Sequence, residues 1–297
     1  MTASPSALRL IVGFSPGSAS HRVAQAIVPG LAAHLRRRVK LIPHPGESGA
    51  IAARMVAAAP PDGNTLLIAT LGTHALVPTI DPACGYHPLN DFTPISLLLM
   101  APLILAVPSS AGIHSIAALI ETARSADPPL VYGSSAVGGA PHLAAELFAQ
   151  RVGVTLQHAR YSDTRQLYAD LLAGRIALSF NNLMSMLPLI REGRLVPLGT
   201  TGPQPHPALP DVPPIANAGL NGYAVTNWVG VVGPANLKAV TVEEIGAALA
   251  TAAHNAETSA ASGIAPSTAE AFEELLRREW DRWTPIVREL GWARRLG

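Results

Sequence analysis

The chain has 297 residues, of which 48% are hydrophobic and 14% charged, and this composition excludes an intrinsically disordered protein. The 21 basic and 20 acidic residues leave a formal net charge of +1. The cluster Arg36, Arg37 and Arg38 is typical of the solvated end of a helix, so no nucleic-acid partner is expected. The longest apolar stretch, 95–107, contains Ser96 and Pro102 and is shorter than the roughly twenty residues that span a bilayer, so no membrane insertion is expected.

The N-terminal segment, 1–7, lacks the basic start and apolar core of a secretory signal. Either such a signal has been removed, or the protein is cytoplasmic because Met1 is its native start. Cys84 is the single cysteine of the sequence, so no disulfide can form within the chain. Its neighbours Ala83 and Gly85 supply no activating group, which argues against a nucleophilic role.

The predicted elements begin with a short apolar strand and an amphipathic helix. Residues 8–12 predict a buried strand, the turn formers of 13–17 end it, and apolar residues at every fourth position from Val23 to Leu35 predict a helix that Pro29-Gly30 kinks or splits. Further predicted elements are a strand at 39–42, a helix at 52–59, and strands at 65–70 and 95–99. This alternation is typical of an α/β fold with helices covering a parallel or mixed sheet.

A second series of elements follows Pro102 and can form a sheet of its own. Because 297 residues exceed the usual size of one core, we expect two α/β lobes, each a mixed sheet flanked by helices. The predicted strands are 103–107, 130–133, 155–159, 176–180 and 194–200, and the predicted helices between them are 115–125, 140–152 and 164–173. The chain is then predicted to continue with a proline-rich loop at 203–214, an extended segment at 223–232 and helices at 242–254 and 267–290.

Four loops that follow predicted strands carry polar side chains among small residues. Two of them, 13–18 and 133–139, precede helices and therefore present unpaired N–H groups and the positive end of a helix dipole, which suit a carboxylate or phosphate. The other two are 71–74 and 181–182. Ligands of α/β sheets bind beyond the carboxyl ends of the strands, so all four loops can meet at one cleft.

Each loop also has a purely structural interpretation. The first is consistent with an ordinary α/β turn, and Asn181 and Asn182 can cap the next helix. His74 can be a surface or turn histidine, and His142 can brace its own helix.

Motifs of the common enzyme classes are missing from the sequence. There is no phosphate-binding P-loop, no dinucleotide fingerprint and no His-Glu-x-x-His, and 133–137 has Val137 where a nucleophile elbow needs glycine. The ten histidines show no metal-ligand spacing. We therefore expect no catalytic residue, no cofactor and no metal.

Motifs in a fixed order along the chain carry a resemblance to a known family. The chain resembles the tripartite tricarboxylate transporter receptors, the Bug family of periplasmic solute-binding proteins. This resemblance implies a two-lobed, Venus-flytrap fold with two hinge strands, one lobe comprising 1–102 with 227–297 and the other 103–226. The motifs are 11–17, 44–49, 61–66, 86–92, 138–143, Tyr161, 170–174, Asn181-Asn182, 208–213, 218–220 and Asn227-Trp228.

The resemblance also implies a function without catalysis. A small carboxylate would be held in the inter-lobe cleft of a periplasmic protein and delivered to membrane permease subunits. The ligand-binding residues expected are Phe14, Ser15, Pro16, Gly17, Ser18, Ala19, His21, Gly72, Thr73 and His74 of the first lobe, and Ser134, Ser135, Ala136, Gly138, Gly139, His142, Tyr161, Asn181 and Asn182 of the second.

Departures from the family pattern bear on the ligand. His21 and Asn181 stand where the family commonly has aspartates, and the loss of negative charge at His21 favours dicarboxylates or aromatic carboxylates over cationic or amino ligands. If His21 lines the cleft it adds a pH dependence to affinity, and otherwise it faces solvent. A cytosolic sensor and an enzyme recruited on the same fold are the alternative functions.

Overall fold

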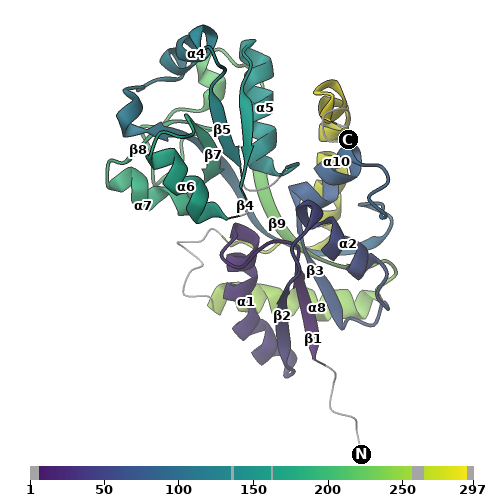
Figure 1. The fold of residues 1–297 in the computed structure, drawn as a ribbon. Coiled ribbons are helices and arrows are strands. Elements are labelled where there is room, and N and C mark those ends of the chain that lie inside the picture. Colours follow the sequence, from purple (N-terminus) through teal and green to yellow (C-terminus); the bar gives the residue numbers. More distant parts are fainter. Residues whose placement is uncertain (1–6, 135–136, 162, 256–263, 293–297) are drawn as a thin grey trace, which may run out of the picture. The chain divides into compact units, whose positions relative to one another are not determined.

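The computed structural model describes residues 7–134, 137–161, 163–255 and 264–292 (Figure 1). The chain forms two compact units, the first comprising 1–100 with 228–297 and the second comprising 101–227. The chain passes from one unit to the other within β4 (Phe92–Pro108) and returns within β9 (Thr226–Pro234). Both units contain strands and helices, so the predicted α/β class is confirmed.

The sheet of the first unit is mainly parallel. β1 (Leu8–Val12) pairs in parallel with β2 (Val39–Pro43) on one side and with β3 (Thr65–Thr70) on the other, and β9 is antiparallel to β3. All of β3 is buried, which is the reason that its sequence is a continuous apolar run rather than an alternating one.

Helices cover the sheet of the first unit. α1 (Ala19–Leu35) and α8 (Ala239–Asn255) lie side by side, and both pack on the face that carries Leu8, Leu10 and Val12 (Figure 1). α10 (Ala269–Glu289) packs on the opposite face, where Phe272 lies against Gly230 of β9. Further helical segments in the described part of this unit are η1 (Glu47–Gly49), α2 (Ala50–Ala57), η2 (Gly72–Leu76) and α3 (Val77–Ile80).

Two elements in this region are continuous where the local sequence signal allows a break. Of the predicted kink or split at Pro29-Gly30, the split does not occur, because α1 continues through both residues. A Cβ on Gly30 would lie 2.6 Å from the Cα of Ala252, so glycine here permits the close approach of α1 and α8. The strands predicted at 95–99 and 103–107 are one strand, β4, because the fixed φ of Pro102 is compatible with extended backbone.

The second unit combines antiparallel and parallel strands. β4 pairs antiparallel with β7 (Ser179–Asn182) and with β8 (Leu195–Thr200), whereas β5 (Val131–Ser134) and β6 (Gln157–Arg160) are parallel. A parallel bridge between Tyr132 and Leu178 joins β5 to the segment that leads into β7. The helices are η3 (Ser109–Ala111), α4 (Ile116–Ser125), α5 (Ala140–Val152), α6 (Thr164–Leu172), α7 (Leu183–Arg191) and η4 (Ile215–Ala218).

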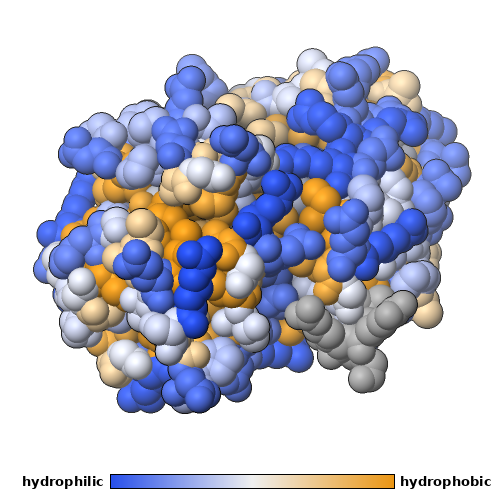
Figure 2. Space-filling view, turned by 90° about the horizontal axis from the view of Figure 1, so that it is seen from above, coloured by the Kyte–Doolittle hydropathy of each residue, from blue (hydrophilic) through white to orange (hydrophobic). Residues whose placement is uncertain are grey.

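Few large hydrophobic side chains are exposed among the described residues. Figure 2 shows hydrophilic residues over much of one face, with apolar residues exposed in separate areas. Met100, Met184 and Val240 are the large hydrophobic residues that are exposed. Within the ranges given above, no helix combines the length and the apolar character needed to cross a bilayer.

We predict that Gly230→Ala lowers the free energy of unfolding by about 1–3 kcal/mol, because the added methyl group would collide with the Phe272 ring in a closely packed core. The control is Gly246→Ala in α8, where an added Cβ meets no atom within 4 Å; this change should stabilise by about 0.5–1 kcal/mol through helix propensity. Urea unfolding measures both, and equal stability of the two variants would contradict the prediction.

Candidate functional site

The first candidate loop joins β1 to α1. Ser15, Pro16 and Gly17 are exposed, and Phe14 packs against the core of the first unit. Ser18 is the N-cap of α1, with its Oγ accepting from the His21 N–H at 3.3 Å. Ala19 begins the helix, so the loop leads directly into N–H groups that lack intrahelical acceptors.

Side chains of α1 hold Gly17 in this loop. Its N–H donates to Nδ1 of His21 at 3.4 Å, and its carbonyl accepts from Nε of Arg22 at 3.1 Å. Sequence reasoning passed over Arg22, although its position one turn after the loop places a guanidinium beside the helix start. Arg22 therefore adds positive charge to a site predicted from neutral donors alone.

The segment 71–74, predicted as a polar corner after β3, is buried. Gly72–Leu76 is a π-helical segment in which every residue is buried. The hydroxyl and the carbonyl of Thr73 both have protein partners, since the Thr70 N–H donates to Thr73 Oγ1 at 3.0 Å and the Tyr86 hydroxyl donates to the Thr73 carbonyl at 2.7 Å. Gly72, Thr73 and His74 consequently have no exposed side chain with which to meet a ligand from solvent in this structure.

His74 is a core histidine, so its interpretation as a surface or turn residue is wrong. Its side chain has 0% exposure, and its ring lies 4.7 Å from that of Phe92 and 6.4 Å from that of Trp228, between ring centroids. Nδ1 forms a 2.9 Å hydrogen bond with Thr73 Oγ1, whereas Nε2 has no partner among the described residues. Burial lowers the pKa of His74 to about 3, so the side chain is neutral at physiological pH.

The second candidate loop joins β5 to α5. Ser134 is buried, Gly138 has a φ of +73°, and its N–H donates to Nδ1 of His142 at 3.0 Å. The predicted contacts Ser135 and Ala136 lie outside the described residues. Gly139 is the N-cap of α5 and has no side chain with which to cap the helix N–H groups.

Aromatic rings pack behind this loop. His158 of β6 lies 4.3 Å from His142 and 4.9 Å from Tyr132, and the rings are nearly parallel. His158 Nε2 forms a 2.8 Å hydrogen bond with Ser134 Oγ, and Tyr132 donates to Glu146 at 2.7 Å. Burial lowers the pKa of His158, with Glu146 opposing this shift and Arg160 adding to it. Sequence reasoning missed His158 and Tyr132, because only the pairing of β5 with β6 brings them together.

Asn181 lies at the same edge of the sheet as the second loop. The parallel bridge of Tyr132 with Leu178 aligns the end of β5 with β7. Asn181 is 4% exposed, and its Oδ1 accepts from the Asn182 N–H at 2.9 Å. Its Nδ2 is buried without a partner among the described residues. The position therefore offers an unused amide donor.

Asn182 and Tyr161 have partners within the second unit. Asn182 occupies the N-cap position of α7, but its side chain forms no cap and instead accepts from Nδ2 of Asn227 at 3.0 Å. The Tyr161 hydroxyl donates to Asp170 at 2.8 Å, and burial together with this hydrogen bond raises the pKa of Tyr161 to about 12. Tyr161 is thus a neutral hydroxyl held by a carboxylate.

Each unit therefore presents a glycine loop before a helix start, with polar side chains beside it. Backbone N–H groups, a hydroxyl and an amide are neutral donors that suit a carboxylate, and the helix dipole adds to the attraction.

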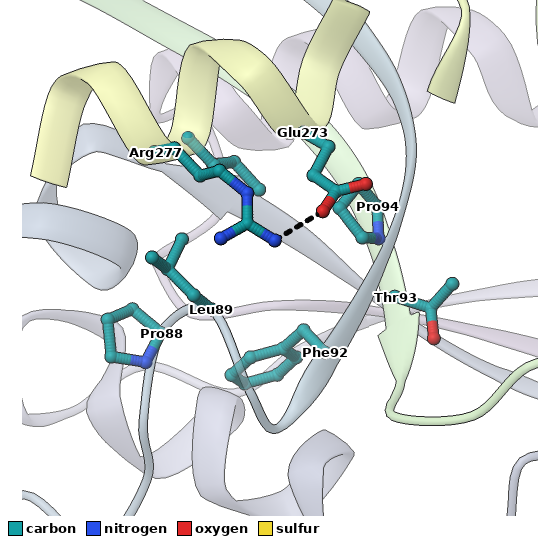
Figure 3. A pocket seen from close by; sticks show the side chains of 8 residues that line it. Pro88, Leu89, Phe92, Thr93, Pro94, Glu273 and Arg277 are labelled. Atoms are coloured by element: carbon teal, nitrogen blue, oxygen red, sulfur yellow. Dashed lines mark hydrogen bonds and ion pairs between the residues drawn. The ribbon is translucent and has the colours of Figure 1, made fainter. Parts of the chain in front are cut away.

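A shallow pocket of about 130 Å³ lies elsewhere in the first unit (Figure 3). Pro88, Leu89 and Phe92 line it, and Arg277 at its edge pairs with Glu273 at 2.6 Å. The predicted site residues do not line it. Because the guanidinium is already paired and the pocket is small, we assign it no role in binding.

Comparisons with known proteins identify the family and the fold of the chain. Residues 23–292 match the family described as "Tripartite tricarboxylate transporter family receptor". A solved structure of R. palustris Rpa4515 with adipate is 31% identical, with a TM-score of 0.87 over 97% of this chain and 98% of that chain. MatC of Rhodopseudomonas palustris with bound malate is 25% identical, with a TM-score of 0.87 over 95% and 99%.

A third solved structure, described as a periplasmic transporter, is 30% identical, with a TM-score of 0.87 over 96% of this chain and 98% of that chain. The expected family and the periplasmic-binding-protein fold are therefore confirmed.

Protonation of His74 should make stability fall in acid. Its pKa is about 3 in the folded protein and about 6.5 when unfolded, so between these values the unfolded chain binds more protons. The free energy of unfolding keeps its full value above about pH 6.5. It falls by about 1.4 kcal/mol per pH unit as the pH is lowered from there toward 3. Urea unfolding at about pH 7 and pH 4 measures the loss.

His74→Leu should reduce this acid slope, whereas His254→Leu, which removes an exposed histidine of α8, should leave it in place. An unchanged slope in the His74 variant would contradict the assignment.

Proposed function

We propose that this chain, which belongs to the tripartite tricarboxylate transporter receptor family, acts in the periplasm, binds a small carboxylate and delivers it to membrane permease subunits. The family is one of transporter receptors and not of enzymes. The relatives described as binding adipate and malate support a carboxylate ligand. The relative described as a periplasmic transporter supports the location.

The observation that carries the proposal is the buried Nδ2 of Asn181 beside the loop that precedes α5, which has no hydrogen-bond partner among the described residues. A buried donor without an acceptor costs about 1–3 kcal/mol, so a position that retains one needs an explanation. A carboxylate at the start of α5 would supply the missing acceptor. The N–H groups at the helix start would share its charge.

The direct contacts in this proposal come from the two glycine loops and the end of β7. Gly72, Thr73 and His74 are buried in the first unit, and a role for them in binding also stays a proposal. The remaining expected contacts stay proposals: Phe14, Ser15, Pro16, Gly17, Ser18 and Ala19 in the first unit, and Ser134, Gly138, Gly139, Asn181 and Asn182 in the second.

A dicarboxylate is the ligand class that we propose. Each loop has the chemistry to hold one carboxylate group, and adipate and malate, which relatives bind, carry two. Arg22 beside the first loop adds a cation that disfavours amino or cationic ligands.

We predict that adipate or malate stabilises the purified protein, by about 2.7 kcal/mol at a ligand concentration of one hundred times Kd. Thermal unfolding against a panel of mono-, di- and aromatic carboxylates measures the effect. 1,6-Diaminohexane is the control, because it matches adipate in length with the opposite charge, and it should not stabilise. Absence of a shift with every carboxylate would contradict the proposed function.

Asn181→Asp should raise the Kd for a dicarboxylate at least about tenfold, which corresponds to a loss of about 1.4 kcal/mol of binding free energy. The change keeps the oxygen that accepts from Asn182 but replaces the unused amide donor with a negatively charged oxygen. Asn217→Asp adds the same charge at an exposed residue of η4 and is the matched control. Calorimetric titration compares the two, and unchanged affinity in the Asn181 variant would remove this residue from the site.

A further inference from the structure

The loops that precede α1 and α5 share a structural plan that the sequence motifs do not reveal. In each, a glycine with positive φ lies four residues before a histidine in the first turn of the helix. Gly17 has a φ of +86° and donates its N–H to Nδ1 of His21; Gly138 has a φ of +73° and donates to Nδ1 of His142. The same device therefore occurs once in each unit.

The hydrogen bond that both loops share determines the tautomer of the two histidine rings. A ring nitrogen that accepts a hydrogen bond carries no proton, so the neutral ring bears its proton on Nε2. The bond also ties the glycine peptide to the helix one turn later. Glycine adopts this backbone conformation without the strain that other residues meet, and the histidine then selects one orientation of its peptide.

We propose that His21 and His142 are matched positioning residues, each of which uses Nδ1 to hold the glycine loop so that the helix-start N–H groups face a carboxylate. This inference rests on the proposed function and refines two residues that the sequence places in the binding site. The histidine acts through the loop and need not touch the ligand itself.

The surroundings of the two histidines predict that they hold their glycine loops with different strength. The hydrogen bond to His142 is 3.0 Å long and its ring lies against His158, so the second loop is held firmly. The bond to His21 is 3.4 Å, beyond the usual range, and Arg22 also holds Gly17 through its carbonyl. Loss of His142 should therefore cost more affinity than loss of His21.

Two substitutions distinguish a histidine that holds the loop through Nδ1 from a side chain that only fills space. In Asn, Oδ1 can replace the accepting Nδ1 of histidine, whereas in Gln the polar atoms lie farther from the backbone, near the position of Nε2. His142→Asn should keep adipate affinity within about threefold of the original, and His142→Gln should lower it about tenfold. The pair His21→Asn and His21→Gln should show the same order with a smaller loss.

Two measurements on the ligand-free protein test the device independently of binding. Long-range proton–nitrogen NMR correlations should show Nδ1 unprotonated and Nε2 protonated in both histidines. Amide exchange of Gly17 and Gly138 should be slow in the original and Asn forms and faster in the Gln forms. An Nδ1–H tautomer, or Gln variants that exchange and bind like the original protein, would overturn the inference.

The two proposals fail in distinguishable ways. If the protein binds none of the carboxylates, the proposed function fails, while the tautomer and exchange measurements still decide whether the histidines hold the loops. If a Gln variant does not fold, the tautomers of the unaltered protein decide.

Discussion

The N–H groups that the first turns of α1 and α5 leave without intrahelical acceptors are the feature on which the proposed binding chemistry depends. They arise because a strand ends in a glycine loop and a helix begins within a few residues, in both units. Such donors are fixed by the fold and carry only partial charge. A carboxylate held mainly by them forms hydrogen bonds of about 1.5–3 kcal/mol without a dedicated buried cation.

Buried strands were the most predictable part of the fold. Leu8–Val12 and Thr65–Thr70 have the predicted bounds, because each is a largely apolar and largely buried run that turn residues flank. The helix Ala140–Val152 was equally predictable from its glycine-bounded ends. β7 lies later than predicted, at Ser179–Asn182, since Leu178 forms only an isolated bridge and the polar residues that follow complete the ladder with β4.

Hydrogen bonds between side chains that are distant or oriented by the fold explain what could not be predicted about the site from the sequence. Gly72-Thr73-His74 has the composition of a turn, yet Thr70 and Thr73 satisfy one another's polar groups and so permit burial of the whole segment. His158 reaches Ser134 only through the pairing of β5 with β6, and no local pattern marks it. The glycine loops themselves were predictable, because positive φ and a helix start leave a signal in adjacent residues; the histidine contacts that hold them depend on side-chain orientation.

The buried nitrogens that lack partners among the described residues differ between the two units in what a ligand can gain from them. Nε2 of His74 and Nε1 of Trp228 lie in a core of aromatic rings, so a ligand arriving from solvent cannot reach them and their cost remains in the free energy of folding. Asn181 lies at the end of a strand beside a glycine loop. For an exposed donor, a ligand merely replaces water, and the net gain is about 0.5–1.5 kcal/mol. A donor that folding has already desolvated loses no water on binding, so a carboxylate that reaches Asn181 gains more from that hydrogen bond than from one to an exposed amide.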